Sequence, residues 1–204
     1  MKKLTKIAAT LAALLLALAL AGCDNDEEPT EENGQADWSG FAMADSVDKL
    51  DFKVGKYELK EMQYADMGTY TGCYDIEILS AEMVTVKDKF DITKFNNKTD
   101  YEKRKAWYES KGDFDDIMTT DDNTLTITMT YSDDPYSTSI SSFKKDFFPE
   151  EDIYADYSET YTDKKCGSKN GVIQMSYTTT YTASAADGGQ TQTYHCIVTL
   201  TPQK

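Results

Sequence analysis

Hydrophobic and polar residues alternate with a period of two over most of the chain beyond its first quarter. The clearest run is Leu125–Tyr131, where large apolar or aromatic residues alternate with threonines. Similar runs begin at Tyr57, Tyr74, Ile173 and Tyr194. This period is typical of β-strands with one buried face, and the abundant Tyr and Thr residues also favour strands. The pattern therefore predicts an all-β domain.

Two weaker strand candidates are Ser137–Phe148 and Ile153–Thr162. Turn residues separate the predicted strands, as at Asp66–Gly68 and at Asp187–Gly189. The gaps between the last three strands are short, and short gaps predict a meander of antiparallel neighbours. We expect about seven or eight antiparallel strands in total.

One segment has the signature of a helix embedded among the strands. Thr99 and Glu102 form a capping box, in which each side chain can accept a hydrogen bond from the backbone N–H of the other residue. The helix is expected to run from Asp100 to about Ser110. Upstream of the strands, Ser46 is expected to cap a short helical turn.

The N-terminal segment follows a different pattern. Lys2, Lys3 and Lys6 form a short cationic region, and an apolar stretch rich in Ala and Leu then runs from Ile7 to Ala21. This stretch is shorter than the roughly 20 residues that a membrane-spanning helix needs. Together with its basic flank, its length is typical of an export signal.

Leu20-Ala21-Gly22-Cys23 closes this stretch and resembles the lipobox of bacterial lipoproteins, where a Leu, a small residue, a Gly and a Cys stand in this order. The resemblance implies that residues 1–22 are a signal peptide that is removed, and that the Cys23 thiol carries diacylglycerol and palmitate. It also implies contact with the membrane through this lipid anchor and a place in the bacterial cell envelope. Outer-membrane, periplasmic and surface-exposed positions all remain open. The alternative is a membrane-spanning anchor with an incidental cysteine.

The residues after Cys23 are acidic and nearly free of apolar side chains. Between residues 24 and 35, the only apolar residue is Pro29. Such a segment repels itself and cannot bury enough surface to fold. We therefore expect residues 23–40 to form a disordered tether. Residues 41–204 are expected to form a single β-rich domain, which is long enough for one sizeable core.

Charge and the scarcity of some side chains exclude several functions. The chain carries 36 acidic against 21 basic residues, and three of the basic ones lie in the predicted signal peptide. This balance argues against binding to nucleic acid. Arg104 and His195 are the single Arg and the single His, which leaves few of the common catalytic groups. Because His195 and Cys196 are neighbours on a predicted strand and point to opposite faces, we expect no catalytic dyad and no enzymatic activity.

Three cysteines remain beside Cys23, namely Cys73, Cys166 and Cys196. An exported chain sits in an oxidising compartment, where one disulfide would leave one thiol over. Three pairings exist. Cys73 and Cys166 fall near predicted strand ends, whereas Cys196 lies on an apolar strand face. We therefore expect a Cys73–Cys166 disulfide and a buried Cys196 thiol.

Acidic side chains crowd the segment after the predicted helix, where their oxygen atoms could gather around Ca²⁺. The residues in question are Asp113, Asp115, Asp116, Asp121, Asp122 and Asn123. The spacing lacks the glycine and the closing Glu of a helical calcium loop, and the chain has no close group of Cys and His for zinc. We therefore expect a solvated turn, no metal site and no cofactor other than the lipid at Cys23.

Val54-Gly55-Lys56-Tyr57, at the start of the first long strand, resembles the Gly-x-Trp opening of lipocalin-like (calycin) barrels, with Tyr57 in place of the Trp. Thr99-Asp100-Tyr101 matches the second short motif of that family, although it falls at the predicted helix start. The late Arg and the C-terminal helix of the family have no counterpart. The resemblance implies an antiparallel up-and-down β-barrel that is closed at one end by the aromatic residue and admits a small ligand at the other. A β-sandwich is the alternative fold.

Aromatic residues supply the best candidates for a ligand site. An apolar wall with polar tips suits a small hydrophobic or amphipathic ligand. The candidates are Tyr57, Trp107, Tyr131, Tyr177 and Tyr181. The same side chains could instead fill an ordinary core with each hydroxyl at its rim, because small barrels are often solid. In that case we expect a non-catalytic interaction or adhesion module that contacts another envelope protein or a host molecule.

Overall fold

The computed structural model describes residues 34–110, 118–149, 158–182 and 191–204. The predicted signal peptide, Cys23, most of the predicted tether, the aspartates at 113–116 and the turn at 187–189 lie outside these residues. The strands are β1 (Ala42–Ala44), β2 (Gly55–Ala65), β3 (Gly68–Ile78), β4 (Met83–Phe95), β5 (Met118–Asp121), β6 (Thr126–Thr130), β7 (Tyr136–Ser139), β8 (Ser158–Lys169), β9 (Val172–Thr182) and β10 (Thr191–Pro202). The helices are the 3₁₀ turn η1 (Val47–Lys49), α2 (Lys98–Glu109) and α4 (Ile140–Phe147).

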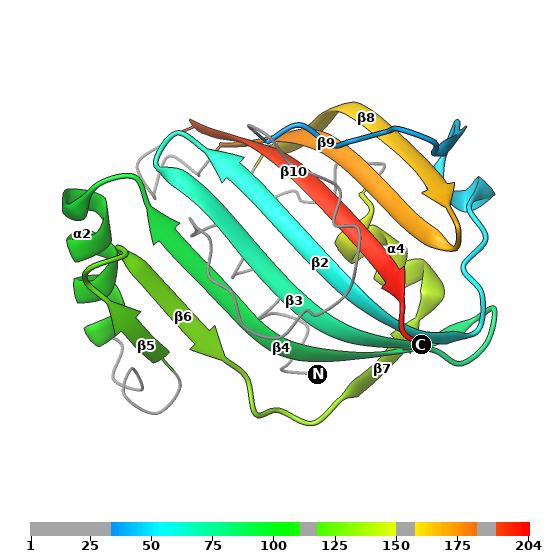
Figure 1. Ribbon diagram of the computed structural model, residues 1–204, viewed down its shortest axis with the longest axis horizontal. Helices are drawn as coiled ribbons and strands as arrows, with labels where there is room; N and C mark the ends of the chain where they lie inside the picture. Colours follow the sequence, from blue (N-terminus) through cyan, green and yellow to red (C-terminus); the bar gives the residue numbers. More distant parts are fainter. Residues whose placement is uncertain (1–33, 111–117, 150–157, 183–190) are drawn as a thin grey trace.

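All of these strands belong to one antiparallel sheet (Figure 1). Its order is β1-β8-β9-β10-β2-β3-β4-β6-β5, and β7 pairs with the first residues of β4. The predicted meander is formed by β8, β9 and β10, and β10 then pairs with β2, the first long strand. Within the described residues the end strands β1 and β5 do not pair with each other, so the sheet is open there. The all-β prediction is confirmed, whereas closure into a barrel is not.

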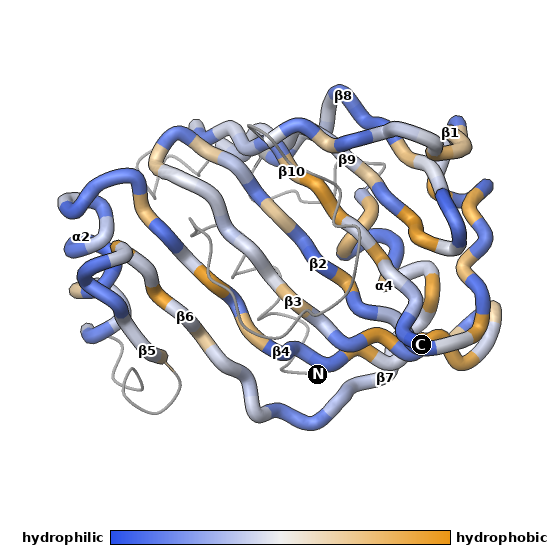
Figure 2. The backbone as a smooth tube through the Cα atoms, in the orientation of Figure 1, coloured by the Kyte–Doolittle hydropathy of each residue, from blue (hydrophilic) through white to orange (hydrophobic). Residues whose placement is uncertain are grey.

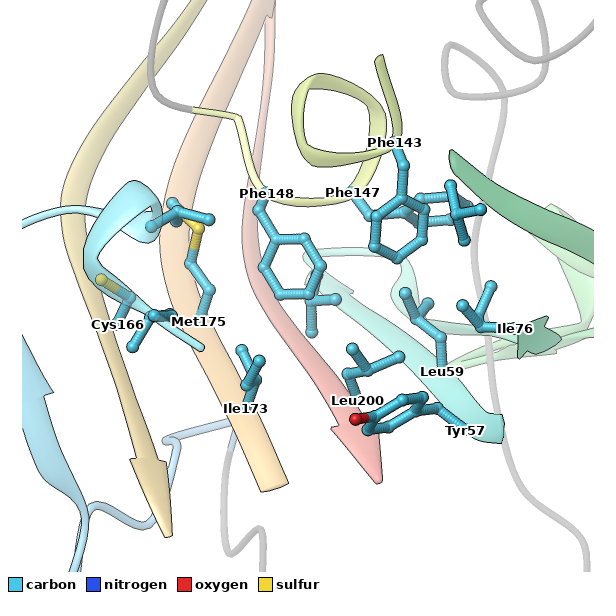
Figure 3. Packing of buried hydrophobic residues seen from close by; sticks show 14 of the residues in the cluster. Tyr57, Leu59, Ile76, Phe143, Phe147, Phe148, Cys166, Ile173, Met175 and Leu200 are labelled. Atoms are coloured by element: carbon cyan, nitrogen blue, oxygen red, sulfur yellow. The ribbon is translucent and has the colours of Figure 1, made fainter. Parts of the chain in front are cut away.

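Strand β2 alternates because one of its two faces is buried. In β2, Tyr57, Leu59, Glu61 and Gln63 are buried, while the residues between them are only partly buried. Figure 2 shows the alternation of hydrophobic and hydrophilic residues along β2. Successive side chains of a strand point to opposite faces, so the alternation fixes which face packs inward. The concave face of the curled sheet holds the main core (Figures 1 and 3).

Helix α4 covers the apolar half of this concave face (Figure 3). Ile140, Phe143 and Phe147 are three or four residues apart and share one helix face, and both phenylalanines are buried. The Ser139 side chain caps the helix by accepting a hydrogen bond from a backbone N–H of the first turn at 3.0 Å. The single strand predicted over Ser137–Phe148 is therefore wrong, because only β7 is extended and the remainder is helical.

Strand β4 contains a bulge that conceals its alternation. The pairing with β3 skips Lys89, which is an extra residue in β4. Before the bulge the buried residues are even-numbered, as are Val84 and Val86, and after it they are odd-numbered, as are Asp91 and Thr93. This change of parity explains why a search for a period of two does not find β4, although it is the longest strand in the described residues.

The predicted helix is confirmed as α2, but a different residue caps it. Asn97 precedes the first turn, and its side chain accepts a hydrogen bond from the Asp100 N–H at 3.0 Å. The helix begins directly after this cap, so Thr99 lies inside it and is not the predicted N-terminal cap. The short turn η1 follows Ser46 as predicted, although the Ser46 side chain makes no capping hydrogen bond.

The predicted Cys73–Cys166 disulfide is wrong, because the two residues lie on distant strands. Neither residue forms a disulfide in the structure. Cys73 is in β3 and Cys166 is in β8, and β9, β10 and β2 separate these strands in the sheet. The intervening strands place them about 20 Å apart along the sheet, whereas the Cα atoms of a disulfide lie within about 7 Å of each other. Cys196 is a fully buried thiol, as predicted.

Part of the predicted tether packs on the folded domain. Gly34 is buried, and a Cβ atom at this position would lie 2.9 Å from the Tyr64 ring. Farther along, Gln174 Nε2 donates a hydrogen bond to the backbone carbonyl of Asp37 at 3.0 Å. Gln174 alternates with the core residues of β9, so this contact lies on the convex face. The folded domain therefore includes residues 34–40, which the sequence had assigned to the tether.

Candidate functional site

The concave face divides into an apolar half under α4 and a polar half farther along β2, β3 and β4. In the apolar half, Tyr57, Leu59 and Ile76 pack beneath the α4 phenylalanines (Figure 3). In the polar half, the buried positions of the same sheet face carry Glu61, Gln63, Tyr70, Asp91 and Thr93. Buried polar groups cost free energy unless they are hydrogen-bonded, and acidic residues are seldom buried without a partner. The polar half is therefore our candidate site.

A single glycine lets two tyrosines meet at the centre of this site. The pairing register aligns Glu61 of β2 with Gly72 of β3, and Gly72 with Asp91 of β4. Gly72 has no side chain, and the hydroxyls of Tyr70 and Tyr74 lie above it, 3.4 Å apart. A Cβ atom at Gly72 would lie 2.7 Å from Tyr70 Oη and 2.8 Å from Tyr74 Oη. We name the following residues the tyrosine–carboxylate cluster: Glu61, Gln63, Tyr70, Tyr74, Asp91 and Tyr131.

Neutral donors hold both carboxyl groups of the cluster. Tyr131 Oη donates to Asp91 Oδ2 at 2.6 Å, and Tyr70 Oη donates to Asp91 Oδ1 at 2.9 Å. On the other side of Gly72, Gln63 Nε2 donates to Glu61 Oε1 at 2.9 Å. Among the described residues, neither carboxyl group takes part in an ion pair. Within the part of the chain that the structure describes, these two buried acids therefore have no cationic partner.

Burial changes the acidity of both groups. Glu61 and Asp91 are each 6% exposed. The pKa of Glu61 is raised to about 7, chiefly by burial, and the charges of Asp91 and Glu159 add to the shift against the hydrogen bond from Gln63. The pKa of Asp91 is raised to about 6, again chiefly by burial, although the hydrogen bonds from two tyrosines oppose the shift. Acids perturbed in this way are concentrated at functional sites, although structural clusters can also perturb them.

Strands β9 and β10 add an aromatic residue and a thiol beside Glu61. Tyr177 and Cys196 face each other across these strands, and both are buried. Burial raises the pKa of the Tyr177 hydroxyl and of the Cys196 thiol well above their usual values, so both groups are neutral near pH 7. Next to them, Thr179 Oγ1 donates to Glu159 Oε1 at 3.3 Å. The polar half therefore extends from β4 across the sheet to β8.

Helix α2 brings the single arginine of the chain to the border of the polar half. The guanidinium carbon of Arg104 lies 4.5 Å from the centre of the Trp107 ring and 4.7 Å from that of Tyr108. Arg104 Nη2 also donates to Tyr108 Oη at 3.2 Å. Burial lowers the pKa of Arg104, and the side chains of Tyr108 and of Tyr194 in β10 oppose this shift. Helix α2 and strand β10 therefore approach each other at this end of the concave face.

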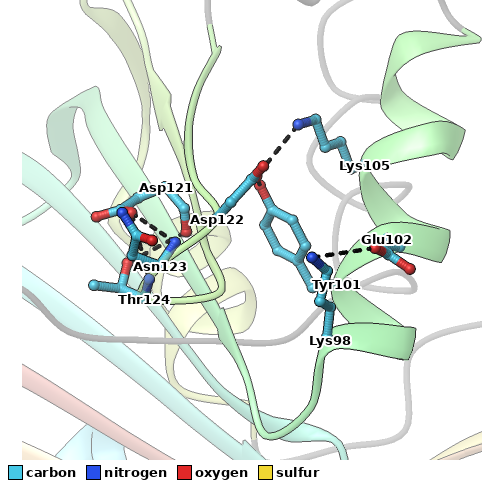
Figure 4. A network of polar contacts seen from close by, with 8 residues as sticks. All are labelled: Lys98, Tyr101, Glu102, Lys105, Asp121, Asp122, Asn123 and Thr124. Carbon is cyan, nitrogen blue, oxygen red and sulfur yellow. Dashed lines mark hydrogen bonds and ion pairs between the residues drawn. The ribbon is translucent and has the colours of Figure 1, made fainter.

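Two of the acids that the sequence suggested as calcium ligands, Asp121 and Asp122, make their contacts within a turn and with α2 (Figure 4). Tyr101 Oη donates to the Asp122 carboxylate, and Lys105 Nζ lies 3.3 Å from Asp122 Oδ1. Asp121 Oδ1 accepts a hydrogen bond from the backbone N–H of Asn123 at 3.0 Å. In the ranges that the structure describes, no three Asp, Glu, His or Cys side chains are arranged to hold a metal ion.

The structure does not bring the five predicted ligand residues together. Tyr131 and Tyr177 lie in the polar half, and Tyr131 belongs to the cluster. Tyr57 lies in the apolar half, where its hydroxyl donates to a backbone carbonyl at 2.9 Å. Tyr181 is partly buried beside the main core, and Trp107 is 43% exposed on α2. The aromatic residues therefore divide between core, site and surface.

The two carboxyl groups are the part of the site that sequence reasoning missed. Glu61 did carry a signal, because it continues the strand face of Tyr57 and Leu59 and is the first acid on that apolar side. Asp91 carried none, because the extra residue Lys89 breaks the alternation just before it. An acid on the buried face of a predicted strand is thus the feature to look for.

A separate pocket of about 330 Å³ lies at the edge of the sheet formed by β1 and β8. It is lined by Ala44, Asp45, Ser46, Lys164, Lys165, Cys166 and Met175. The Cys166 thiol at its wall donates to the backbone carbonyl of Ala44 at 3.4 Å. The pocket shares no residue with the tyrosine–carboxylate cluster and is lined by none of the five predicted ligand residues.

His195 and Cys196 point to opposite faces of β10, as strand alternation requires. Cys196 is fully buried in the core, whereas His195 is partly buried on the convex face. Burial lowers the pKa of His195. The single imidazole of the chain is therefore on the opposite face of the sheet from the carboxyl groups of the cluster.

No protein-family model, curated protein or solved structure matches the chain. None of the helices in the described residues is long and apolar enough to span a bilayer. The basis for assigning a function is therefore the chemistry of the chain itself, namely its N-terminal signals and the contacts of the cluster.

Proposed function

We propose that this protein is a lipid-anchored lipoprotein of the bacterial cell envelope whose β-domain binds a small amphipathic ligand at the polar half of its concave face. The observation that carries the proposal is the tyrosine–carboxylate cluster, in which neutral side chains donate hydrogen bonds to two buried acids. Such convergent polar groups beside apolar and aromatic side chains suit a ligand with one polar and one apolar part. The polar part would contact the cluster, and Tyr177 and Tyr194 would border the apolar part.

The apolar half supports an amphipathic ligand rather than a wholly hydrophobic one. Phe143, Phe147 and Phe148 fill it, and their exposed fractions are 0%, 5% and 1%. The Phe143 and Phe147 ring centres lie 5.3 Å apart, and Phe52 packs against Phe148 at 5.6 Å. A hydrophobic ligand would have to displace α4, whereas the polar half offers hydrogen-bonding groups that α4 does not use.

A lipocalin-like relationship is part of the proposal. Gly55 and Tyr57 open β2, and the last strand β10 pairs with this first long strand, as the first and last strands of an up-and-down barrel do. Tyr57 is buried near one end of the apolar half. The gap between β1 and β5 is the departure from a closed barrel, and α4 fills part of the concave face.

The remaining features of the proposal concern the anchor and the absence of catalysis. The lipobox at Leu20–Cys23 supports a lipid on Cys23, and this lipid is the only cofactor we infer. The single His lies on the convex face, so the cluster lacks the base that nucleophilic catalysis commonly uses. We therefore infer that the domain binds its ligand without transforming it.

A second candidate function is a non-catalytic interaction module, and one observation favours it. The concave core is filled by the α4 phenylalanines, which is what we expect of a domain that acts through its surface. In the described residues, the three-residue strand β1 pairs with Cys166–Ser168 of β8 and ends the sheet on this side, and partner proteins commonly add a strand at such a sheet edge. A partner protein from the envelope would then extend the sheet.

Uptake of amphipathic probes separates the two functions. The full chain, extracted gently into a mild detergent, would be examined by native mass spectrometry and titrated with a fluorescent fatty acid and a fluorescent long-chain amine. We expect a co-purifying small molecule or saturable binding of one probe, weakened about tenfold or more by Tyr131→Phe, which removes one polar group of the site. Tyr136→Phe in β7, outside the cluster, is the matched control and should bind as the wild type does.

The opposite result is equally clear. If no small molecule co-purifies and neither probe binds, the ligand proposal is wrong and the interaction module becomes the better account. Equal weakening by Tyr131→Phe and Tyr136→Phe would show that the cluster is not the binding site.

A further inference from the structure

Glu61 and Asp91 face the same buried space across a single strand. Both are aligned with Gly72, which lies between them in the sheet. Neighbouring strands lie about 4.8 Å apart, so the backbones of the two acids are about 10 Å apart. The Tyr70 and Tyr74 hydroxyls lie in the space that the missing side chain of Gly72 leaves. The two carboxyl groups therefore belong to one cluster and affect each other through it.

Among the residues that the structure describes, the titratable groups that interact with the pair add no positive charge. Titratable groups that interact electrostatically with Glu61 come from β3, β4, β8, β9 and β10 and are Tyr70, Tyr74, Asp91, Glu159, Tyr177 and Cys196. Those that interact with Asp91, besides Glu61, are Tyr70, Tyr74, Asp88, Tyr108 and Tyr131. Every one of these groups is an acid, so ionisation of any of them adds negative charge.

Two basic side chains, Lys89 of β4 and Arg104 of α2, contact groups outside the cluster. Lys89 Nζ lies 2.8 Å from Glu58 Oε2 and 3.3 Å from Asp75 Oδ1, away from the cluster. Arg104 contacts Tyr108 and acts on Tyr194. Two carboxylates that are ionised together in a buried site repel each other with little screening by water. A proton on either one removes this repulsion.

We propose that the tyrosine–carboxylate cluster is a pH-sensitive switch, in which the folded domain holds a proton on the Glu61–Asp91 pair near neutral pH and the loss of this proton loosens the polar half. Ionisation of both acids would place one negative charge on each side of Gly72, and Glu159 would add a further charge that acts on Glu61. The switch requires no ligand, so it goes beyond the proposed binding function and can fail or hold independently of it.

The direction of the pH dependence follows from proton linkage. An acid whose pKa is raised on folding binds its proton more tightly in the folded state than in the unfolded chain, where the pKa is about 4. The stability that this proton contributes is complete below about pH 4 and is lost as the pH rises through the folded pKa values of about 6 for Asp91 and about 7 for Glu61. For each such acid, the ratio of folded to unfolded protein falls about tenfold for every unit by which the pH rises between the unfolded and the folded pKa.

Urea unfolding of the full chain in mild detergent, at pH values from about 5 to about 8.5, tests the switch. Glu61→Gln keeps the acceptor for Gln63 but cannot ionise. As the pH rises to about 7, we expect the folded-to-unfolded ratio of the wild type to fall about tenfold per pH unit relative to that of Glu61→Gln. Above about pH 7 the difference between the two proteins should stay constant. Asp91→Asn should diverge from the wild type in the same direction and level off near pH 6.

Glu77→Gln is the matched control, because Glu77 is an exposed acid on the neighbouring strand β3. Its stability should follow the wild type at every pH. Infrared spectra of the wild type provide a readout that needs no variant to fold, since a protonated carboxyl group has its own carbonyl band. We expect this band near pH 5.5 and its loss above about pH 8.

Three results would overturn the proposal. The first is a set of parallel pH profiles for the wild type, Glu61→Gln and Asp91→Asn. The second is the absence of a protonated-carboxyl band near pH 5.5. The third concerns the loosening of the polar half. We expect amide hydrogen exchange in β2–β4, corrected for intrinsic exchange, to rise with pH more in the wild type than in Glu61→Gln. Equal exchange rates in the two proteins would refute the loosening.

Discussion

Among single residues, Gly72 has the most direct control over the cluster. Its Cα faces the hydroxyls of Tyr70 and Tyr74, and an added methyl group would lie 2.7 and 2.8 Å from their oxygen atoms. Tyr70 cannot simply swing away, because its hydroxyl is held by Asp91 at 2.9 Å. We expect Gly72→Ala to lower the free energy of unfolding by about 1–3 kcal/mol, as overpacking of a buried site does. Equilibrium urea denaturation measures this loss.

A double-mutant cycle tests the cause of that loss. In a Tyr70→Phe background the nearer hydroxyl oxygen is absent, so Gly72→Ala should cost less than in the wild type. Equal costs in the two backgrounds would mean that the destabilisation arises from the contact with Tyr74 or from the β3 backbone rather than from the contact with Tyr70.

The residues of the site were predictable only in part. Tyr131 and Tyr177 were identified from their alternation in clean strands, and both lie in the polar half. Glu61 follows the same rule, since any acid on the buried face of a strand needs an explanation. The burial of Asp91 could not be predicted from the sequence, because it depends on a β-bulge that is seen only in the pairing of β4 with β3.

At the level of secondary-structure elements, the N-terminal cap of α2 distinguishes the observed helix from the predicted one. Asn97 Oδ1 accepts the Asp100 N–H at 3.0 Å, whereas Thr99 lies inside the first turn. We expect Asn97→Ala to destabilise the protein by about 1 kcal/mol, the usual cost of losing a cap. Thr99→Ala is the control and should change stability by less than about 0.5 kcal/mol. Thermal unfolding of both variants checks this, and a larger effect of Thr99→Ala would restore the capping box.

Elements with one uninterrupted period were predicted well, and those with a change of period were not. The buried residues of β2 keep one parity, and in β6, β9 and β10 the large core residues recur at every second position, so the core faces of these strands follow from the sequence. The segment Tyr136–Phe147 changes from a period of two to helical spacing at Ile140, and the sequence reading extended the strand across that point. The prediction of a disulfide was wrong for a related reason, because a disulfide depends on which strands are neighbours in the sheet. The Cys73–Cys166 pair looked compatible only while the order of the strands was unknown.

For the whole molecule, the order of the strands is the property that local patterns encode least. Antiparallel neighbours joined by short turns were predictable, as in the β8–β9–β10 meander. The pairing of β10 with β2 and of β1 with β8 joins segments far apart in the chain. The same holds for α4, which packs on the concave face against strands that are distant from it in the sequence (Figure 1). The order of the strands therefore depends on which elements, distant in the sequence, pack against each other. Alternation within a single strand does not contain that information.

The lipid anchor is a prediction about the whole molecule, because it fixes how far the domain can move from a bilayer. Residue 34 packs against Tyr64, so the tether after Cys23 can span at most about 40 Å. We expect radiolabelled palmitate to be incorporated into the wild type, which should fractionate with membranes. Cys23→Ser removes the thiol that accepts the lipid, so it should incorporate no label and leave the membrane fraction. Cys166→Ser, which removes a buried thiol in β8, should keep the label. Equal labelling of Cys23→Ser and the wild type would mean that the domain reaches the envelope by another route and that the acidic segment is not a tether.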